Sequence, residues 1–583
     1  MIKKLALSLR EYKKSSIIAP IFITLEALLD VVIPMLMAKL IDFGIDAKNM
    51  AYILKMGVYL FIGAILAILF GVIAGNNAAA ASAGFAKNLR HDMYYKVQDF
   101  SFSNIDKFST GGIVTRLTTD VTNLQNAYQM ILLVAVRSPA MLVLSLIAAF
   151  HIDAHISVIF LIAAPILGVG LFFIMYKVHP IFQRVFRTYD KLNNTVHENL
   201  SGIRVVKAFT RESHEEEKFD GISESIYQDF SRAQKRLAFN MPLVQICIYG
   251  SMLLLSWFGA KAIVASGNNP AAGLSTGSFM SLITYTMQIM MNLMMLSMVF
   301  VMIVVSHSSA ERVIEVLDEK SSLKNCSEPV YEVKDGSVNF EDVNFSYARK
   351  SDKPVLNHIN LSIASGEMVG IIGGTGSSKS SLVQLIPRLY DVTEGRVLVG
   401  GVDVKKYDIE TLRNQVSMVL QKNVLFSGTI KDNLRWGDEN ASDEEMVRAC
   451  QLAQADGFIR ELPDQYDTYI DQGGTNVSGG QKQRICIARA LLKKPKILIL
   501  DDSTSAVDTK TDALIRKAFK EDIPNTTKII IAQRISSIQD ADKTVVLDDG
   551  KINAVGTHEE LLRSCSIYRE VYESQTRGGM IHE

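Results

Sequence analysis

The chain contains 583 residues, carries equal numbers of acidic and basic residues, and is 48% hydrophobic. This length is too great for one ordinary domain, and the hydrophobic share is high for a soluble protein of this size. A net charge of zero gives no reason to expect a nucleic-acid partner. The five cysteines are scattered without a CxxC pair, so they fit a reducing cytosolic compartment and predict no metal site.

The first half of the chain holds apolar segments that are long enough to cross a bilayer. A spanning helix needs roughly 20 residues. We predict six spans, at Ile17 to Leu40, Met56 to Ala74, Met130 to Phe150, Ile156 to Tyr176, Pro242 to Val264 and Phe279 to Val305. The expected fold is therefore an α-helical polytopic membrane domain in the lipid bilayer of the cell membrane.

The basic residues set the expected orientation of these spans. Lys and Arg are frequent in the N-terminal segment and in the two long connections, 75–129 and 177–240, but rare in the short connections between them. By the positive-inside rule both chain termini and both long connections are cytoplasmic. The segment Ile2 to Tyr12 is too short and too charged to span, so we expect an amphipathic helix at the membrane surface.

The two long connections contain few helix breakers, so we predict helices that continue beyond the bilayer. Each pair should reverse at a short coupling helix, near 110–118 and near 203–212. A polar linker at 319–335 then separates the membrane domain, 1–318, from a second domain of α/β type, 336–583. Such extensions either transmit motion between the domains or form a purely structural hairpin.

The second domain carries a phosphate-binding loop. An apolar strand at Met368 to Ile372 leads into a glycine-rich stretch and then a helix, which is the context of a P-loop ATPase. Backbone N–H groups close around the phosphates, Lys379 reaches the β- and γ-phosphates, and the Ser380 hydroxyl coordinates Mg²⁺. The expected ATP-binding residues are Gly373, Gly374, Thr375, Gly376, Ser377, Ser378, Lys379, Ser380 and Ser381, with Asp501 at the end of a second apolar strand.

Further positions extend this nucleotide site. Tyr347 could stack on adenine, although a tyrosine in an edge strand more often only packs. Gln421 follows a short strand and could reach Mg²⁺ or an attacking water. A helix that presents backbone N–H groups and a positive dipole end to an anion should begin within Val477, Ser478, Gly479, Gly480 and Gln481.

Together these motifs resemble the ATP-binding cassette family, and nearly the whole chain resembles its exporter half-transporters, with six spans fused to one nucleotide-binding domain. The resemblance implies ATP and Mg²⁺ as cofactors, adenine stacking for Tyr347, and a link from Mg²⁺ to the membrane domain through Gln421. It also implies that Ser505 to Asp508 form an inter-subunit loop. Two such domains would sandwich ATP, with each signature, here Val477 to Gln481, facing the partner's phosphate loop, so a second half-transporter is the expected partner.

Three residues depart from the family pattern. Asp502 stands where the family has a glutamate that polarises the attacking water, and misplacing a base by about 1 Å can cost on the order of a hundredfold in rate. Gln533 replaces the switch histidine, so this position can donate a hydrogen bond to the γ-phosphate but cannot gain a proton. Ser378 replaces a glycine. We therefore expect ATP binding to survive better than hydrolysis.

The signature keeps its Ser-Gly-Gly-Gln core, with only Val477 in the usual leucine place. An intact signature beside an impaired ATP site predicts the degenerate subunit of a heterodimeric multidrug exporter that moves small amphipathic compounds out of the cytoplasm. The alternatives are a homodimeric lipid or peptide exporter with two slow sites, and an ATP-gated channel or regulatory subunit. The two departures at separate catalytic positions favour the heterodimer.

Charged residues inside the predicted spans suggest a substrate cavity. Glu26 and Asp30 are four residues apart and so share one face of the first span, and Arg137 lies within the third. Intramembrane charge is costly, so it points to function or to pairing. Either the carboxylates attract cationic amphipathic compounds, or they pair with Arg137 or lie near an interface.

Overall fold

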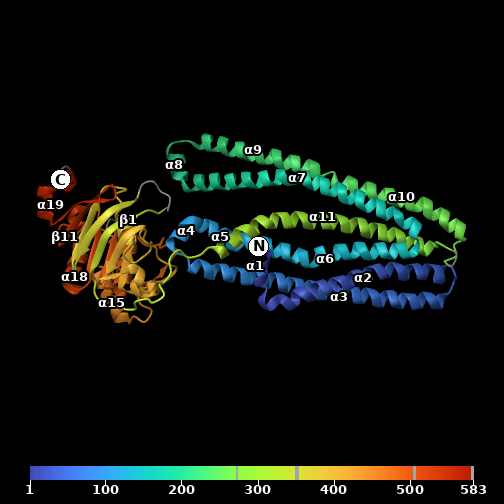
Figure 1. The fold of residues 1–583 in the computed structure, drawn as a ribbon, viewed down its shortest axis with the longest axis horizontal. Coiled ribbons are helices and arrows are strands. Elements are labelled where there is room, and N and C mark those ends of the chain that lie inside the picture. The colour runs from blue at the N-terminus through green and yellow to red at the C-terminus, as the bar shows by residue number, and fades with distance from the viewer. Residues whose placement is uncertain (271–272, 348–353, 503–506, 580–583) are drawn as a thin grey trace. The chain divides into compact units, whose positions relative to one another are not determined.

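A computed structural model describes residues 1–583 apart from 271–272, 348–353, 503–506 and 580–583 (Figure 1). Its contacts divide the chain into two compact units. The first unit comprises Met1–Gln98 and Ser109–Glu319. The second unit comprises Asp99–Phe108 and Lys320–Glu583.

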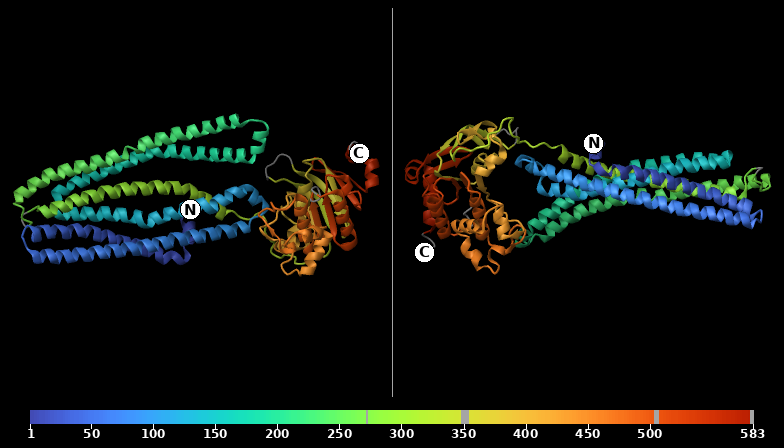
Figure 2. Two further views of the ribbon diagram at one scale, coloured as in Figure 1. Left: turned by 180° about the vertical axis from the view of Figure 1, so that it is seen from behind. Right: turned by 90° about the horizontal axis from the view of Figure 1, so that it is seen from below.

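The first unit is built of long helices that lie side by side (Figures 1 and 2). Within the described residues, six helical runs are long and apolar enough to cross a membrane, which confirms the six predicted spans. The helices are α1 (Ile2–Leu7), α2 (Lys13–Leu40), α3 (Met50–Gln98), α5 (Thr110–Thr115), α6 (Val121–Ile152), α7 (Ala154–Ser201), α8 (Ile203–Ala208), α9 (Glu212–Leu237), α10 (Asn240–Ser266) and α11 (Thr276–Asp318). Their shared core buries large side chains such as Phe160, Leu167 and Tyr285.

The first long connection reverses earlier than 110–118, so that prediction is corrected. The reversal lies at 99–109, around the short helix α4 (Phe102–Phe108), and 110–152 then form one helical run. Gly111 and Gly112 occupy the first turn of α5, where the Ser109 side chain accepts a hydrogen bond from Gly112 N–H and caps the helix. In the second connection α8 lies within the predicted range, 203–212.

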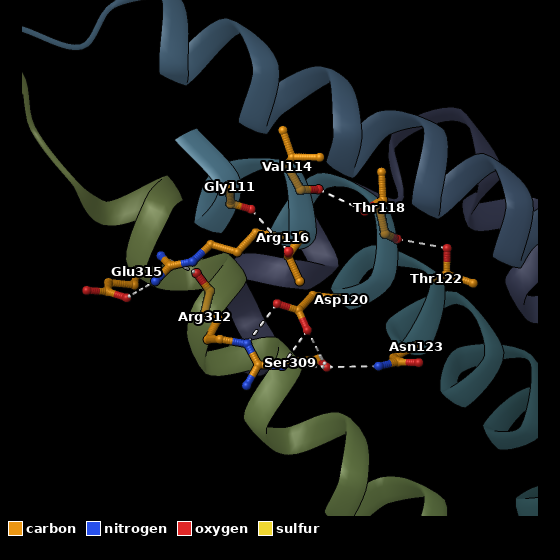
Figure 3. Close-up of polar contacts among 11 residues, drawn as sticks. Gly111, Val114, Arg116, Thr118, Asp120, Thr122, Asn123, Ser309, Arg312 and Glu315 are labelled. Atoms are coloured by element: carbon orange, nitrogen blue, oxygen red, sulfur yellow. Dashed lines mark hydrogen bonds and ion pairs between the residues drawn. The ribbon is translucent and has the colours of Figure 1, made fainter. Parts of the chain in front are cut away.

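A polar cluster around the buried Asp120 joins the start of α6 to the C-terminal part of α11 (Figure 3). A π-helical turn, Arg116–Asp120, connects α5 to α6 and ends at a carboxylate whose side chain is 1% exposed. Arg312 donates from Nε to Asp120 Oδ2 over 2.8 Å and from Nη2 to Oδ1, and Ser309 Oγ donates to Oδ1 over 2.8 Å. We call Asp120, Ser309 and Arg312 the α6–α11 clamp.

The second unit is of α/β type and holds three sheets among its described residues. The largest has the order β12-β11-β3-β10-β9-β6, and its strands are parallel except at the β11–β12 pair. These strands are β3 (Met368–Gly373), β6 (Val416–Val419), β9 (Ile497–Asp501), β10 (Thr527–Ile531), β11 (Lys543–Asp548) and β12 (Lys551–Gly556). The other strands are β1 (Val338–Phe345), β2 (Leu356–Ile363), β4 (Glu394–Val399), β5 (Val402–Asp403), β7 (Gly428–Thr429) and β8 (Tyr469–Ile470).

The central strands β3, β9 and β10 position the candidate site. Every residue of β9 and β10 is buried, as expected for parallel strands covered on both faces. Their carboxyl ends meet at one edge of the sheet, where ligands bind in open α/β folds. The helices around the sheets are α12 (Lys379–Gln384), α13 (Ile409–Gln415), α14 (Ile430–Arg435), α15 (Asp443–Leu452), α16 (Asp456–Glu461), α17 (Gly479–Leu492), α18 (Thr509–Asp522), α19 (His558–Ser564) and α20 (Ser566–Gly579).

The segment expected to be a linker, 319–335, packs largely within the second unit. Val330 N–H donates to the Lys406 carbonyl over 2.9 Å, and Val333 is only 2% exposed. The helix α4 also belongs to this unit, because Tyr390 Oη donates to Asp106 Oδ2 over 2.8 Å. The division by contacts therefore takes residues 99–108 out of the predicted membrane domain, 1–318.

Candidate nucleotide-binding site

The phosphate loop lies between β3 and α12, as its motif predicts. At Gly373 a Cβ atom would come within 2.2 Å of the Leu547 carbonyl oxygen, so only glycine fits there. Gly376 has a φ of +84°, which also favours glycine. Ser378, at the N-cap of α12, has a φ of 72° and is a serine in left-handed backbone. This conformation costs a non-glycine residue roughly 1 kcal/mol.

Lys379 folds back across its own loop. Its Nζ donates to the carbonyls of Gly373 and Gly374 over 2.9 and 2.8 Å and to Ser377 Oγ over 3.3 Å. Burial lowers the pKa of the lysine, while Asp502 and Asp501 oppose that shift. An entering phosphate would replace the loop carbonyls as the partner of Lys379.

Ser380 and Asp501 form a pair of oxygen ligands suited to Mg²⁺. Ser380 Oγ donates to Asp501 Oδ1 over 2.9 Å, and Asp501 is 3% exposed at the end of β9. Burial raises the pKa of the Asp501 carboxyl, against the hydrogen bond from Ser380. Magnesium prefers a few protein oxygens together with phosphate oxygens and water, so a hydroxyl and a carboxylate beside a phosphate loop fit Mg²⁺ bound with ATP.

The three expected catalytic positions converge on one carboxylate. Gln533 Nε2 donates to Asp502 Oδ2 over 2.6 Å, and Gln421 Nε2 reaches the same oxygen at 3.4 Å. Burial raises the pKa of the Asp502 carboxyl, while both hydrogen bonds act in the opposite direction. Asp502 also has a positive φ of 49°. Two neutral amides thus hold the carboxylate at the edge of the sheet.

Tyr347 lies beside the phosphate-loop helix. Its hydroxyl is 2.9 Å from Ser381 Oγ, and its ring meets the Phe345 and Tyr390 rings edge-on, with centroid distances of 4.9 and 5.1 Å. The residue is 49% exposed, so part of the ring remains open for stacking. Tyr347 therefore packs in an aromatic cluster, and adenine stacking on its exposed face stays a prediction.

The signature residues lie at the start of α17. Ser478 caps α17, and Ser478 and Gln481 form a reciprocal capping box. A hollow of about 460 Å³ lies there. It is lined by Ser478, Gly479, Gly480, Arg484, Val507 and Asp508. Of the expected inter-subunit loop, Ser505 to Asp508, the first two residues lie outside the described part of the chain.

Sequence reasoning missed two residues that contact these groups. Gln483 of α17 is 2% exposed, and its Nε2 lies 3.4 Å from the Asp502 carbonyl oxygen. Gln575 of α20 bonds to the backbone around Gln533. The glutamine two positions after the signature could have been suspected from its place on α17. No pattern in the sequence marks Gln575.

The three charged residues expected inside the spans, Glu26, Asp30 and Arg137, pair with one another. Arg137 Nη2 lies 2.7 Å from Asp30 Oδ2 and 3.3 Å from Glu26 Oε1. Gln288 Nε2 donates to the Asp30 carbonyl over 3.1 Å, which ties α11 to α2 beside this pair. The pairing alternative is therefore the arrangement found, with two carboxylates and one guanidinium in the cluster.

Two family models match the two parts of this chain. Residues 16–309 match the family model "ABC transporter transmembrane region", and residues 356–505 match the model "ABC transporter". The chain belongs to the ABC transporter family. It is a half-transporter in architecture, with a six-helix transmembrane domain fused to one ABC ATPase domain.

Relatives of this ABC transporter match along most of its length. It is 34% identical to an uncharacterised ABC transporter ATP-binding protein of Bacillus subtilis, with 97% of each chain covered. It is 32% identical to an ATP-dependent lipid A-core flippase of Desulfotalea psychrophila, over 84% of each chain. A bacterial Atm1-family ABC exporter solved with ATP bound shares the fold, with a TM-score of 0.80 and 24% identity over 97% of this chain and 99% of that one.

Proposed function

We propose that this chain is the degenerate-site subunit of a heterodimeric ABC exporter in the cell membrane, moving small amphipathic compounds out of the cytoplasm. One observation carries the proposal. The carboxylate at the position of the catalytic base belongs to Asp502, and the Gln533 amide donates to it over 2.6 Å. A glutamate would reach one methylene further toward an attacking water.

The chemistry of the site supports binding more than hydrolysis. Lys379, Ser380 and Asp501 would hold the triphosphate and its Mg²⁺. When bound, ATP supplies the free energy of phosphoanhydride hydrolysis. Gln533 would leave Asp502 and donate to the γ-phosphate, and an amide in this place takes up no proton during the reaction.

The intact signature supports a division of labour between two subunits. The capping box keeps the first turn of α17 formed, so the N–H groups of Gly479 and Gly480 stay available for an anion. In the proposed heterodimer these groups contact ATP in the partner's competent site. Closure of the two ATPase domains would move α4, which lies between α3 and α5 along the chain, and so reach the membrane helices.

The membrane cluster supports a cationic class of substrate. Glu26 and Asp30 carry two negative charges, and Arg137 compensates for one of them. The remaining charge would favour cationic amphipathic compounds over anionic ones within a space of low dielectric constant.

A homodimeric lipid exporter is the second candidate, because a relative 32% identical to this chain is a lipid A-core flippase. Two copies would then form two slow sites. The two candidates differ in what the purified chain does by itself.

ATPase assays test the proposal directly. The full chain in lipid nanodiscs would be assayed alone and after co-expression with half-transporters encoded beside it. We expect weak turnover alone and strong turnover with a partner that carries Glu and His at the matching positions. Full-rate turnover by the chain alone, abolished by Asp502→Ala, would overturn the heterodimer and favour the homodimer.

A further inference from the structure

The C-terminal helix α20 binds the backbone of the switch loop, by which we mean the residues from Gln533 to Ile535 that follow β10. Gln575 Oε1 accepts a hydrogen bond from Ile535 N–H over 2.9 Å. Gln575 Nε2 donates to the Gln533 carbonyl over 2.8 Å. One side-chain amide therefore satisfies a backbone donor and a backbone acceptor two residues apart, on the same loop.

The helix that carries Gln575 is anchored in the ATPase core. Tyr568 is fully buried, and its hydroxyl lies 2.8 Å from His558 Nδ1 of α19. Tyr568 precedes Gln575 by seven residues, which is two helical turns, so both lie on the same face of α20. Val571 and Tyr572, between them, also pack against the core. The Gln575 amide thus approaches the switch loop from a fixed support.

The residues that follow the switch loop have their own support. Ser537, in the 3₁₀ turn Ile535–Ser537, donates from Oγ to Asp512 Oδ2 of α18 over 2.9 Å. Asp512 is 3% exposed and also contacts Arg516. With α20 holding the switch-loop backbone and α18 holding Ser537 after it, the Gln533 side chain is the part of the loop directed at Asp502.

We propose that Gln575 is a positioning residue for the nucleotide site, which fixes the switch-loop backbone so that the Gln533 amide is aimed in advance at the γ-phosphate position. The inference rests on the proposed role of Gln533 at the γ-phosphate. Holding a donor in place before binding removes the entropy that ordering it would otherwise cost. ADP lacks the γ-phosphate, so the affinity for ADP should not depend on the orientation of the Gln533 amide.

Affinities for ATP and ADP would therefore be measured on the full chain in nanodiscs, at low temperature to suppress turnover. We expect Gln575→Ala to reduce the ratio of ATP to ADP affinity about fivefold to tenfold, roughly the effect of one hydrogen bond, with ADP affinity unchanged. Gln575→Glu keeps the acceptor for Ile535 N–H but lacks the donor for the Gln533 carbonyl, so it should also lower the ratio. Glu570→Ala, an exposed change on another face of α20, should leave it unchanged.

The outcomes separate this inference from the function on which it rests. A wild-type chain without preference for ATP, or a Gln533→Ala variant that keeps the wild-type preference, would contradict the role of Gln533. If Gln533→Ala lowers the ratio and Gln575→Ala does not, Gln575 is not a positioning residue. Equal losses of ATP and ADP affinity in Gln575→Ala would show a general structural role and would also overturn the inference.

Discussion

Arg312 of α11 donates hydrogen bonds to both carboxylate oxygens of Asp120, the last residue of the π-helical turn before α6 (Figure 3). The contact joins the start of one spanning helix to the end of the last one, and α11 runs directly into the ATPase unit along the chain. π-Helical turns are rare and occur often at functional sites. The clamp is thus a candidate route for motion between α6 and α11.

Asp120→Asn should destabilise the chain by about 1.5–3 kcal/mol, because a buried hydrogen-bonded charge is lost from Arg312 and Ser309. The measurement is the apparent Tm in detergent. Glu315→Gln is the matched control, since it removes a neighbouring ion pair to Arg116 whose carboxylate is 46% exposed. That control should cost less than about 1 kcal/mol. Equal effects of the two variants would contradict a special role for the buried Asp120 carboxylate of the clamp.

Ser378→Gly should stabilise the phosphate loop. It releases the strain of a left-handed serine, roughly 1 kcal/mol, partly offset by the freer unfolded chain, so the net gain is about 0.5 kcal/mol. ATP affinity should rise as well. Ser378→Ala keeps the Cβ atom and should bring neither gain. Thermal shift and ATP titration on the same preparations check both effects, and a gain in the alanine variant would point away from backbone strain.

The pair Asp502→Glu and Gln533→His should restore hydrolysis at this chain's own site. The longer carboxylate returns the base toward the water, so we expect at least about a tenfold gain in turnover. The assay uses the chain with a partner whose own site carries a Glu→Gln change at its base. No gain in the double variant would mean that other features impair the site.

Asp502→Asn should raise the apparent Tm of the nucleotide-free chain near neutral pH. Burial raises the pKa of this carboxyl above its value in the unfolded chain. The ionised carboxylate therefore lowers the stability of the folded state at pH values above the folded-state pKa. This destabilisation disappears at pH values below the unfolded-state pKa. The advantage of the asparagine variant should therefore shrink between about pH 7.5 and about pH 5. A difference in apparent Tm between the two proteins that grows toward acid pH would show that burial does not raise the pKa of Asp502.

Arg137→Gln should destabilise the chain by about 2–3 kcal/mol, because two carboxylates lose their counter-ion within a spanning segment. The loss should appear as a lower yield and a lower apparent Tm. The triple variant Glu26→Gln, Asp30→Asn, Arg137→Gln removes the charges together and should recover most of the loss. Transport of a cationic dye by inverted vesicles would then report on the carboxylates, and should fall in the triple variant.

The sequence predicted structure best where a chemical or physical requirement allows only one residue pattern. The glycines around Lys379 and the apolar strand before Asp501 predicted the phosphate site, and span length predicted the membrane helices. The turn predicted near 110–118 was wrong, because Ser109 caps a helix there whose first turn tolerates Gly111 and Gly112. It was silent on Gln575, since a contact between segments far apart in the chain leaves no local signal.

The aromatic cluster around Tyr390 gives α4 a direct physical link to the nucleotide pocket. The Tyr390 ring lies 6.0 Å from the Phe102 ring of α4 and 5.1 Å from the Tyr347 ring, measured between centroids. If adenine stacks on Tyr347, three rings in series would lie between the base and the helix that joins α3 to α5. An ATPase fragment that begins at the linker would lack α4 and therefore the Phe102 ring. In such a fragment, adenine bound at Tyr347 would have no contact with α4 through this cluster.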